Sequence, residues 1–208
     1  MKSETCFTFG MKDRRDKILD VAVALAEEGG FENVRQRDVA ANAGVALGTL
    51  YKRFRSKEDI LVAALERETE VLERRMELNP ATGRTPIARL GSFFEIVTKG
   101  LCRKPKYARA VLRAMASGEA GVAQSVASYQ GRMTGLIIAA MRGVGRLSYA
   151  DATTAPPSKK ENKLAFLLQQ IWFAALVGWS AGLVSQNDVV EQVKGAAALL
   201  LKGIESEP

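Results

Sequence analysis

The chain of 208 residues contains no histidine, and this absence narrows the chemistry that it can perform. Histidine is the commonest general base near neutral pH and the commonest ligand of transition metals. The sequence also shows no paired-carboxylate arrangement and no glycine-rich phosphate-binding motif. We therefore expect no catalytic residues, no metal site and no cofactor. Among the possible functions, a helical enzyme ranks below every function based on binding alone.

Cysteines and long apolar runs are scarce as well. Cys6 and Cys102 lack the spacing of a disulfide framework, so we expect two free thiols in a reducing compartment. No run reaches the roughly 18 uncharged apolar residues of a membrane span. The most apolar stretch, 164–184, is interrupted by Gln169 and Gln170. Without an apolar signal segment at the N-terminus, a cytoplasmic location and no membrane partner are the simplest interpretation.

Positive charge is present in excess. The chain has 30 Lys and Arg against 23 Asp and Glu, a net charge of +7, which favours a polyanionic partner. Its 47% hydrophobic and 25% charged shares are those of an ordinary globular protein. Apolar residues recur mainly at helical spacing, so the sequence predicts an all-α fold of about nine helices.

Two short helices joined by a tight turn are predicted near the N-terminus. The first spans 36–43, and Gly44 then provides a turn that requires a positive φ angle. The second spans about 47–54 and buries Leu50 and Phe54, which are four residues apart. A helix-turn-helix that inserts its second helix into the DNA major groove has this division between a buried face and an outward face.

The positive charge is concentrated at these helices. Residues 35–57 contain six Lys and Arg against one Asp, a net of +5. Contact with phosphates requires such a local field, because neutralising phosphates releases counterions. Charge alone also fits a helical hairpin whose basic residues are simply solvated.

The segment 38–61, DVAANAGVALGTLYKRFRSKEDIL, resembles the DNA-binding signature of the TetR family of one-component bacterial repressors. The shared features are the Ala-Gly-Val turn at 43–45, the run 48–51, Phe54, and the Ser-Lys-Glu at 56–58. The resemblance implies a homodimeric repressor that binds a palindromic operator in double-stranded DNA and is released by a small apolar effector. Family members often have a Ser or Thr cap before the first of the two helices, where this chain has Arg and Gln.

The resemblance also implies which side chains contact DNA. It assigns phosphate contacts to Thr49, Tyr51 and Lys57. It places five residues near base edges: Arg37, Leu47, Gly48, Lys52 and Arg53. Phosphate contacts set the register of a protein on DNA and base contacts set its sequence preference, so the two groups are expected to respond differently to mutation.

Three segments are expected along the chain. Residues 1–11 are predicted to be a flexible arm, 12–56 a helix-turn-helix DNA-binding domain, and 57–208 a helical domain for effector binding and dimerisation. The first helix is expected to begin near Asp13, with Phe31 packing back after its end. The later helices are expected at 56–78, 86–104, 105–117, 120–144, 160–184 and 187–204, with a mobile loop at 143–159.

The C-terminal segment contains candidate pocket and interface residues. The predicted pocket lining is aromatic or sulfur-containing, although such residues at helical spacing also fit an ordinary core: Phe93, Phe94, Met115, Tyr129, Met133, Trp172 and Phe173. The last two helices are apolar nearly all round, which predicts a four-helix seam between two subunits. Its candidate residues are Leu168, Trp179, Leu183, Val193, Ala197 and Leu200.

Three further segments are TPIARL at 85–90, LCRKPKYARAVLRAM at 101–115 and the apolar stretch at 171–201. In order and spacing they resemble KstR-type repressors of sterol and lipid catabolism within the TetR family. This resemblance implies a lipid, sterol or acyl-CoA effector. Residues 99–113 contain six basic residues and no acidic one. This strip fits a second DNA contact, a grip for an acidic ligand group such as phosphate, or a solvated rim. Two other functions stay open: a regulator that responds to drugs or xenobiotics, and a dimeric DNA-binding co-regulator without an effector.

Overall fold

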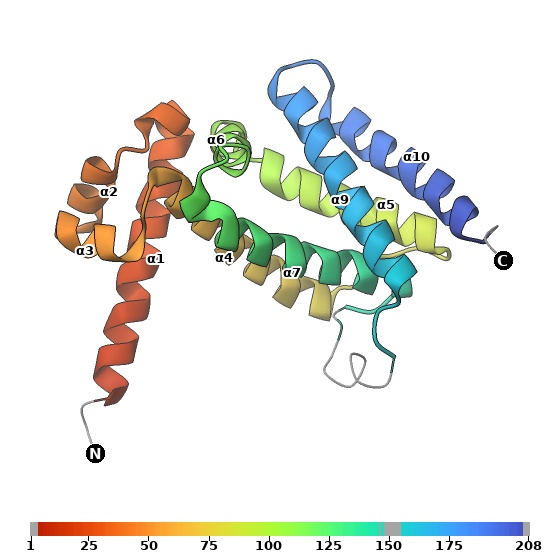
Figure 1. Ribbon diagram of the computed structural model, residues 1–208, viewed down its shortest axis with the longest axis horizontal. Helices are drawn as coiled ribbons and strands as arrows, with labels where there is room; N and C mark the ends of the chain where they lie inside the picture. Colours follow the sequence, from red (N-terminus) through yellow and green to blue (C-terminus); the bar gives the residue numbers. More distant parts are fainter. Residues whose placement is uncertain (1–3, 146, 148–154, 206–208) are drawn as a thin grey trace. The chain divides into compact units, whose positions relative to one another are not determined.

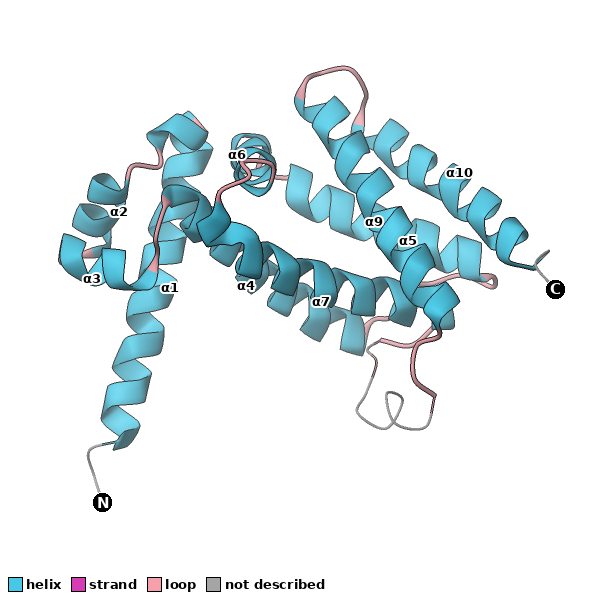
Figure 2. Ribbon diagram, in the orientation of Figure 1, coloured by secondary structure: helices cyan, strands magenta, loops and turns pink. Residues whose placement is uncertain are grey.

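The computed structural model describes residues 4–145, 147 and 155–205, and all regular structure in these residues is helical (Figures 1 and 2). The described part contains nine α-helices, two 3-10 helices and no strand, which confirms the predicted all-α fold. The elements are α1 (Glu4–Gly29), η1 (Phe31–Asn33), α2 (Gln36–Ala43), α3 (Leu47–Arg53), α4 (Lys57–Leu78), α5 (Pro86–Cys102), α6 (Pro105–Met115), η2 (Ala120–Val122), α7 (Ala123–Arg142), α9 (Lys159–Ser180) and α10 (Gln186–Glu205).

The chain divides into two compact units. The N-terminal unit consists of Met1–Arg67 and Lys104–Ala127, and the C-terminal unit of Glu68–Arg103 and Ser128–Pro208. Helix α6 belongs to the N-terminal unit because it packs on α1 and η1. Helix α6 thus returns to the first helix, although it lies within the predicted segment 57–208. The functional segments expected from the sequence stay predictions.

Helix α1 begins at Glu4 rather than near Asp13, so residues 4–11 are helical where a flexible arm was expected. The prediction depended on a sustained stripe of apolar residues at helical spacing, and this short segment is not long enough to show one. A helix that has already formed can extend without an apolar stripe, since each added residue gains a hydrogen bond at little cost. Residues 1–3 of the predicted arm lie outside the described part.

The first turns of two helices are closed by side-chain hydroxyl groups. The Ser56 hydroxyl accepts a hydrogen bond from the Asp59 backbone N–H at 3.2 Å, and the Thr85 hydroxyl accepts one from the Ala88 N–H at 3.2 Å ahead of Pro86. Hydroxyl caps of this kind contribute about 1 kcal/mol each. Helix α9 ends at Ser180, four positions short of its predicted end, where the backbone turns toward α10.

The core of the C-terminal unit lies among α5, α9 and α10, and α10 packs on both other helices. Figure 1 shows α9 and α10 side by side, joined by a short loop. Phe94 lies against Phe93 and Trp172, with ring centroids 5.2 and 6.0 Å away. The Trp172 indole N–H donates a buried hydrogen bond of 2.9 Å to the Thr98 hydroxyl, so the one polar atom of that ring is satisfied.

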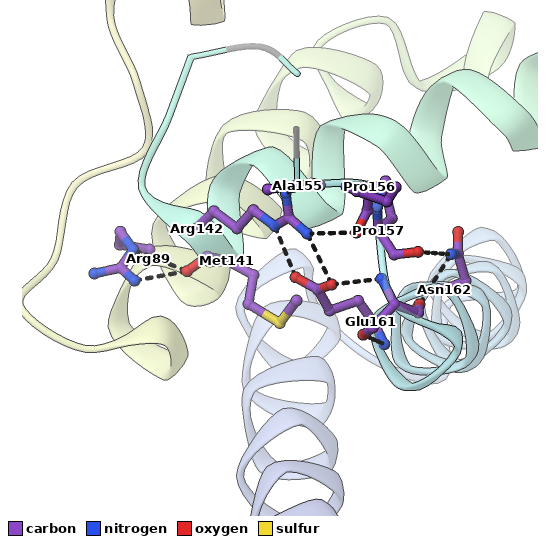
Figure 3. Close-up of polar contacts among 9 residues, drawn as sticks. Arg89, Met141, Arg142, Ala155, Pro156, Pro157, Glu161 and Asn162 are labelled. Carbon is purple, nitrogen blue, oxygen red and sulfur yellow. Dashed lines mark hydrogen bonds and ion pairs between the residues drawn. The ribbon is translucent and has the colours of Figure 1, made fainter. Parts of the chain in front are cut away.

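Polar contacts fix the end of α7 and the start of α9 (Figure 3). Arg142 donates two hydrogen bonds to the Glu161 carboxylate, of 2.7 and 2.9 Å, and a third of 2.8 Å to the Ala155 carbonyl. The Ser158 backbone N–H donates to the same carboxylate at 2.8 Å. Hydrogen bonding from Arg142, assisted by Ser158, lowers the pKa of Glu161 to about 2. Nearby, Arg89 donates to the Met141 carbonyl at the end of α7.

Replacement of Glu161 by Gln should destabilise the fold in a pH-dependent way. The carboxyl titrates near 2 in the folded chain and near 4.5 when unperturbed, so its stabilisation is complete above pH 4.5 and is lost as the pH falls toward 2. We expect Glu161→Gln to lower the free energy of unfolding by about 2 kcal/mol at pH 7. Urea unfolding at several pH values would measure this difference, which should shrink steadily below pH 4.5.

Glu191 provides a matched control for this measurement, since it forms an exposed ion pair with Lys194 three residues along α10. Glu191→Gln should leave unfolding nearly unchanged at every pH, because exposed pairs contribute little. A pH-independent loss in Glu161→Gln would show that packing, and not the charge, is responsible.

Candidate nucleic-acid interface and effector region

The turn between α2 and α3 has the geometry expected from its glycine. Gly44 has φ 66° and ψ 35°, and the Val45 N–H donates to the Ala40 carbonyl at 3.0 Å. A left-handed residue followed by this bond is a common helix C-terminus, and glycine adopts it without steric cost. The turn therefore ends α2 and sets the direction in which α3 begins.

The inner face of α3 is fully buried. Leu50 has no exposed surface and Phe54 is 4% exposed, as the four-residue spacing predicted. The Gln36 side-chain amide donates to the Phe54 carbonyl at 3.4 Å, which joins the start of α2 to the end of α3. No side chain caps α2 at Arg35, in agreement with the departure from the family pattern at this position.

The residues expected to contact DNA lie on the other side of these two helices. Arg37, Gly48, Tyr51 and Lys52 are exposed, with Tyr51 at 50%. Leu47, Thr49 and Arg53 are half-buried. None of the seven lies in the core, so α3 presents the outward face that the motif requires. Their individual roles stay predictions.

Lys57, the eighth residue of this group, has partners that the sequence did not indicate. Its ammonium lies 3.3 Å from the Glu32 carboxylate and 3.9 Å from the centroid of the Phe31 ring. Arg113 of α6 contacts the same two residues, at 2.8 Å from Glu32 and 4.2 Å from the ring centroid. The Lys57 hydrogen bond and the two positive charges hold the pKa of Glu32 below its usual value.

These four residues, Phe31, Glu32, Lys57 and Arg113, form what we call the shared-carboxylate cluster. Phe31 was expected to pack back on the first helix, and it is half-buried with cations on its ring. No periodicity connects positions this far apart in the sequence. Only the fold, which returns α6 to η1, brings them together.

Most of the predicted pocket residues are tightly buried. Phe93, Phe94, Met133, Tyr129 and Trp172 are at most 4% exposed, while Phe173 is half-buried. Met115 is half-buried and belongs to the N-terminal unit, unlike the other six. Burial raises the pKa of the Tyr129 phenol. Two pockets in the described residues are lined by other side chains, and a role of the predicted residues in effector binding stays a prediction.

A polar group inside the C-terminal unit was missed by the sequence analysis. Gln169 on α9 is 4% exposed, and its amide oxygen has no hydrogen-bond partner among the described residues. An unpaired buried acceptor costs on the order of 1–3 kcal/mol, so such a position suits a bound donor group.

Helix α7 contains two glycines, Gly131 and Gly135. A Cβ at either position would meet nothing within 4 Å, which argues against close helix packing as the reason for these glycines.

The residues predicted for the dimer interface differ in their burial within the single chain. Leu168, Val193 and Ala197 have no exposed surface within the chain itself, because they face the core that α9 and α10 build with α5. Their contact with a partner subunit stays a prediction. Leu183 is exposed, and Trp179 and Leu200 are half-buried, so these three stay candidates.

The fold and the outward face of α3 define a helix-turn-helix DNA-binding regulator, and comparisons with known proteins specify its family. Residues 18–64 match the model for bacterial regulatory proteins of the tetR family. Residues 83–200 match the model of a tetracyclin repressor-like C-terminal domain. The chain belongs to the TetR family of transcriptional regulators, whose members are generally not enzymes.

Individual relatives agree with this assignment. The chain is 34% identical to the HTH-type transcriptional repressor KstR of Rhodococcus jostii, over 91% of this chain and 84% of the relative. A TetR transcriptional regulator from Rhodococcus sp. RHA1 has a similar structure, with a TM-score of 0.75, 26% identity, and coverage of 94% of this chain and 98% of the other. Thermus thermophilus FadR, solved with lauroyl-CoA, shares the fold at a TM-score of 0.70 and 19% identity, over 93% and 96% of the two chains.

In the described residues, no helix combines the length and apolar character that crossing a membrane requires. The same residues contain no group of three or more Cys, Asp or Glu side chains arranged to hold a metal ion. The buried Cys102 thiol has its pKa raised to about 11 by desolvation, so it is mostly protonated at neutral pH and a weak nucleophile.

Proposed function

We propose that this TetR-family regulator is a cytoplasmic homodimeric repressor that binds a palindromic operator and is released by a small apolar effector. The outward face of α3 carries the proposal: Lys52 and Arg53 project from a helix whose other side, Leu50 and Phe54, is buried. A single such helix reads only a few base pairs, and two related by a two-fold axis read a palindrome. In this proposal residues 12–56 contact DNA and 57–208 respond to the effector and dimerise.

Variants of the outward face should separate base reading from phosphate binding. Lys52→Ala and Arg53→Ala should relax sequence preference at particular operator positions, by about 1–3 kcal/mol each. Lys57→Ala should weaken all DNA sequences alike and reduce the salt slope by about one. Binding titrations on a set of operator variants at several salt concentrations would measure both effects.

Arg75 on α4 is an exposed arginine outside the motif, so Arg75→Ala serves as the charge-matched control and should change neither quantity. A uniform loss of affinity in all three motif variants would show that the base-reading assignment is mistaken.

The dimer proposal is supported by apolar side chains that the chain leaves exposed on its last two helices. On α9, Phe166 is 50% and Val177 43% exposed, and their separation of eleven residues places them on one helix face with the half-buried Phe173. Leu183 in the connecting loop and Leu199 on α10 are more exposed still. Exposed apolar side chains of this size and number are typical of an interface between subunits.

Charged substitutions on this face should therefore dissociate the dimer. We expect Phe166→Glu and Val177→Glu to yield monomers in sedimentation velocity at micromolar concentration, because each would bury an unpaired carboxylate between subunits. Leu78→Glu, at an exposed leucine on α4, is the matched control and should stay dimeric. If both α9 variants remained dimers, the interface would have to lie elsewhere.

The effector proposal draws on the relatives and on the C-terminal unit. FadR of T. thermophilus binds lauroyl-CoA, and KstR is a repressor with a similar C-terminal domain. The interior of this unit is mostly apolar, and the Gln169 amide oxygen is a buried acceptor in need of a donor. A lipid, a sterol or an acyl-CoA is the class of ligand that fits this interior.

An apolar effector should stabilise the protein and release it from DNA, since by linkage it must bind the released form better. We expect lauroyl-CoA at a hundredfold excess over its Kd to add about 2.7 kcal/mol of stability in thermal unfolding. It should also lower operator affinity in titrations, whereas free CoA should do neither.

The same two measurements, thermal unfolding and operator titration, are made with sterol acids and with a cationic xenobiotic dye. A response to the dye alone would support the drug-responsive alternative. A complete lack of response, with DNA binding intact, would support a co-regulator without an effector.

A further inference from the structure

A basic pocket of about 340 Å³ lies within the N-terminal unit, where α6 packs on the end of α1 and on η1. Three cations line it, namely Lys106, Arg109 and Arg113, together with the Phe31 ring and the backbone at 29–30. Among the described residues that line the pocket there is no carboxylate. The side chains that line this concave site are therefore all positively charged or uncharged, and the Glu32 carboxylate lies beside it, paired with Arg113.

The three cations come from a single face of α6, because spacings of three and four residues superpose on a helix. Like charges at these spacings repel each other. Glu32 offsets part of this repulsion by pairing with Arg113, and an anion bound beside the three cations would offset more of it. Helix α6 also has no acidic residue in its first turn. Lys106 donates to the Glu28 carbonyl at 2.8 Å, which holds its ammonium at the rim beside the end of α1.

We propose that this pocket binds the phosphate or diphosphate group of a small molecule. Two guanidinium groups and an ammonium are the donors that proteins use to hold phosphate oxygens, and guanidinium does so with paired hydrogen bonds. The volume lies at the lower end of the range for small-molecule sites. The lining comes from α1, η1 and α6, and none of it from α2 or α3, so a site here is distinct from the face proposed to enter DNA.

The pocket is connected to that face through the shared-carboxylate cluster. Arg113 lines the pocket and also pairs with the Glu32 carboxylate, which in turn pairs with Lys57. When a bound phosphate group attracts the Arg113 guanidinium, Glu32 loses this partner and pairs with Lys57 only. The Lys57 ammonium is then less available to a DNA phosphate, so the bound anion lowers DNA affinity. This second step rests on the proposed function, whereas the binding site itself does not.

Inorganic pyrophosphate is the probe for the site, added to the full chain without DNA and followed by isothermal titration calorimetry. Sodium sulfate at matched ionic strength measures the general salt effect. Arg109→Gln and Arg113→Gln should each weaken pyrophosphate binding at least about tenfold, which is the loss of one charged hydrogen-bond pair. Arg109→Lys keeps the positive charge but not the paired N–H donors of a guanidinium, so it should lose less pyrophosphate affinity than Arg109→Gln.

Arg84→Gln removes an exposed arginine outside the pocket and should bind pyrophosphate like the unmodified chain. Circular dichroism confirms that each variant is folded before titration. Pyrophosphate that binds no better than sulfate, or binds equally well to Arg109→Gln and Arg113→Gln, overturns the site.

The connection to DNA is tested with Glu32→Gln. Pyrophosphate should lower the DNA affinity of the unmodified chain at least about fivefold relative to sulfate. In Glu32→Gln, pyrophosphate should bind at least as tightly, because an acid beside the pocket is gone, but DNA affinity should no longer respond. If the response persists in Glu32→Gln, the carboxylate is not the link. A chain that binds pyrophosphate but no DNA contradicts the proposed function and leaves the site standing.

Discussion

Burial of Leu50 and Phe54 beneath α3 is the interaction on which the rest of the N-terminal unit depends. Each side chain contributes about 1.5–3 kcal/mol when removed from water, and both lie on one side of a helix of two turns. That side is thereby fixed, and with it the side that carries Tyr51, Lys52 and Arg53. A helix this short would not be stable alone, so its orientation is set by packing and by the Gly44 turn.

Local features of the fold could be predicted because their causes are local. Gly44 requires no partner to favour a left-handed turn. The spacing of Leu50 and Phe54 likewise identifies a buried face without knowledge of what covers it. For this reason the bounds of α2 agree with the prediction, and those of α3 and α4 differ by only a residue at one end.

Features that depend on contacts between residues far apart in the chain could not be predicted from the sequence. Leu168 and Val193 are apolar on helices that are apolar nearly all round, so periodicity could not separate the side facing the core from the side left for a partner. The shared-carboxylate cluster joins residues from η1, α4 and α6, whose proximity follows from the path of the chain. Glutamine is usually a surface residue, so nothing in the sequence was a reason to select Gln169. Its burial in the structure makes it a candidate for ligand contact.

The shared carboxylate also bears on how tightly a repressor of this kind should hold DNA. In typical allosteric proteins an effector changes the free energy of DNA binding by only about 1–3 kcal/mol. If the Kd for the operator lay very far below the concentration of repressor, a change of this size would leave the operator occupied. Glu32 offsets part of the positive charge of Lys57, one of the groups proposed to contact phosphate. Because Arg113 competes for that carboxylate, the charge available to DNA depends on a residue of α6. If Lys57 contacts phosphate as proposed, a single acidic side chain therefore reduces the positive charge that this lysine offers to DNA.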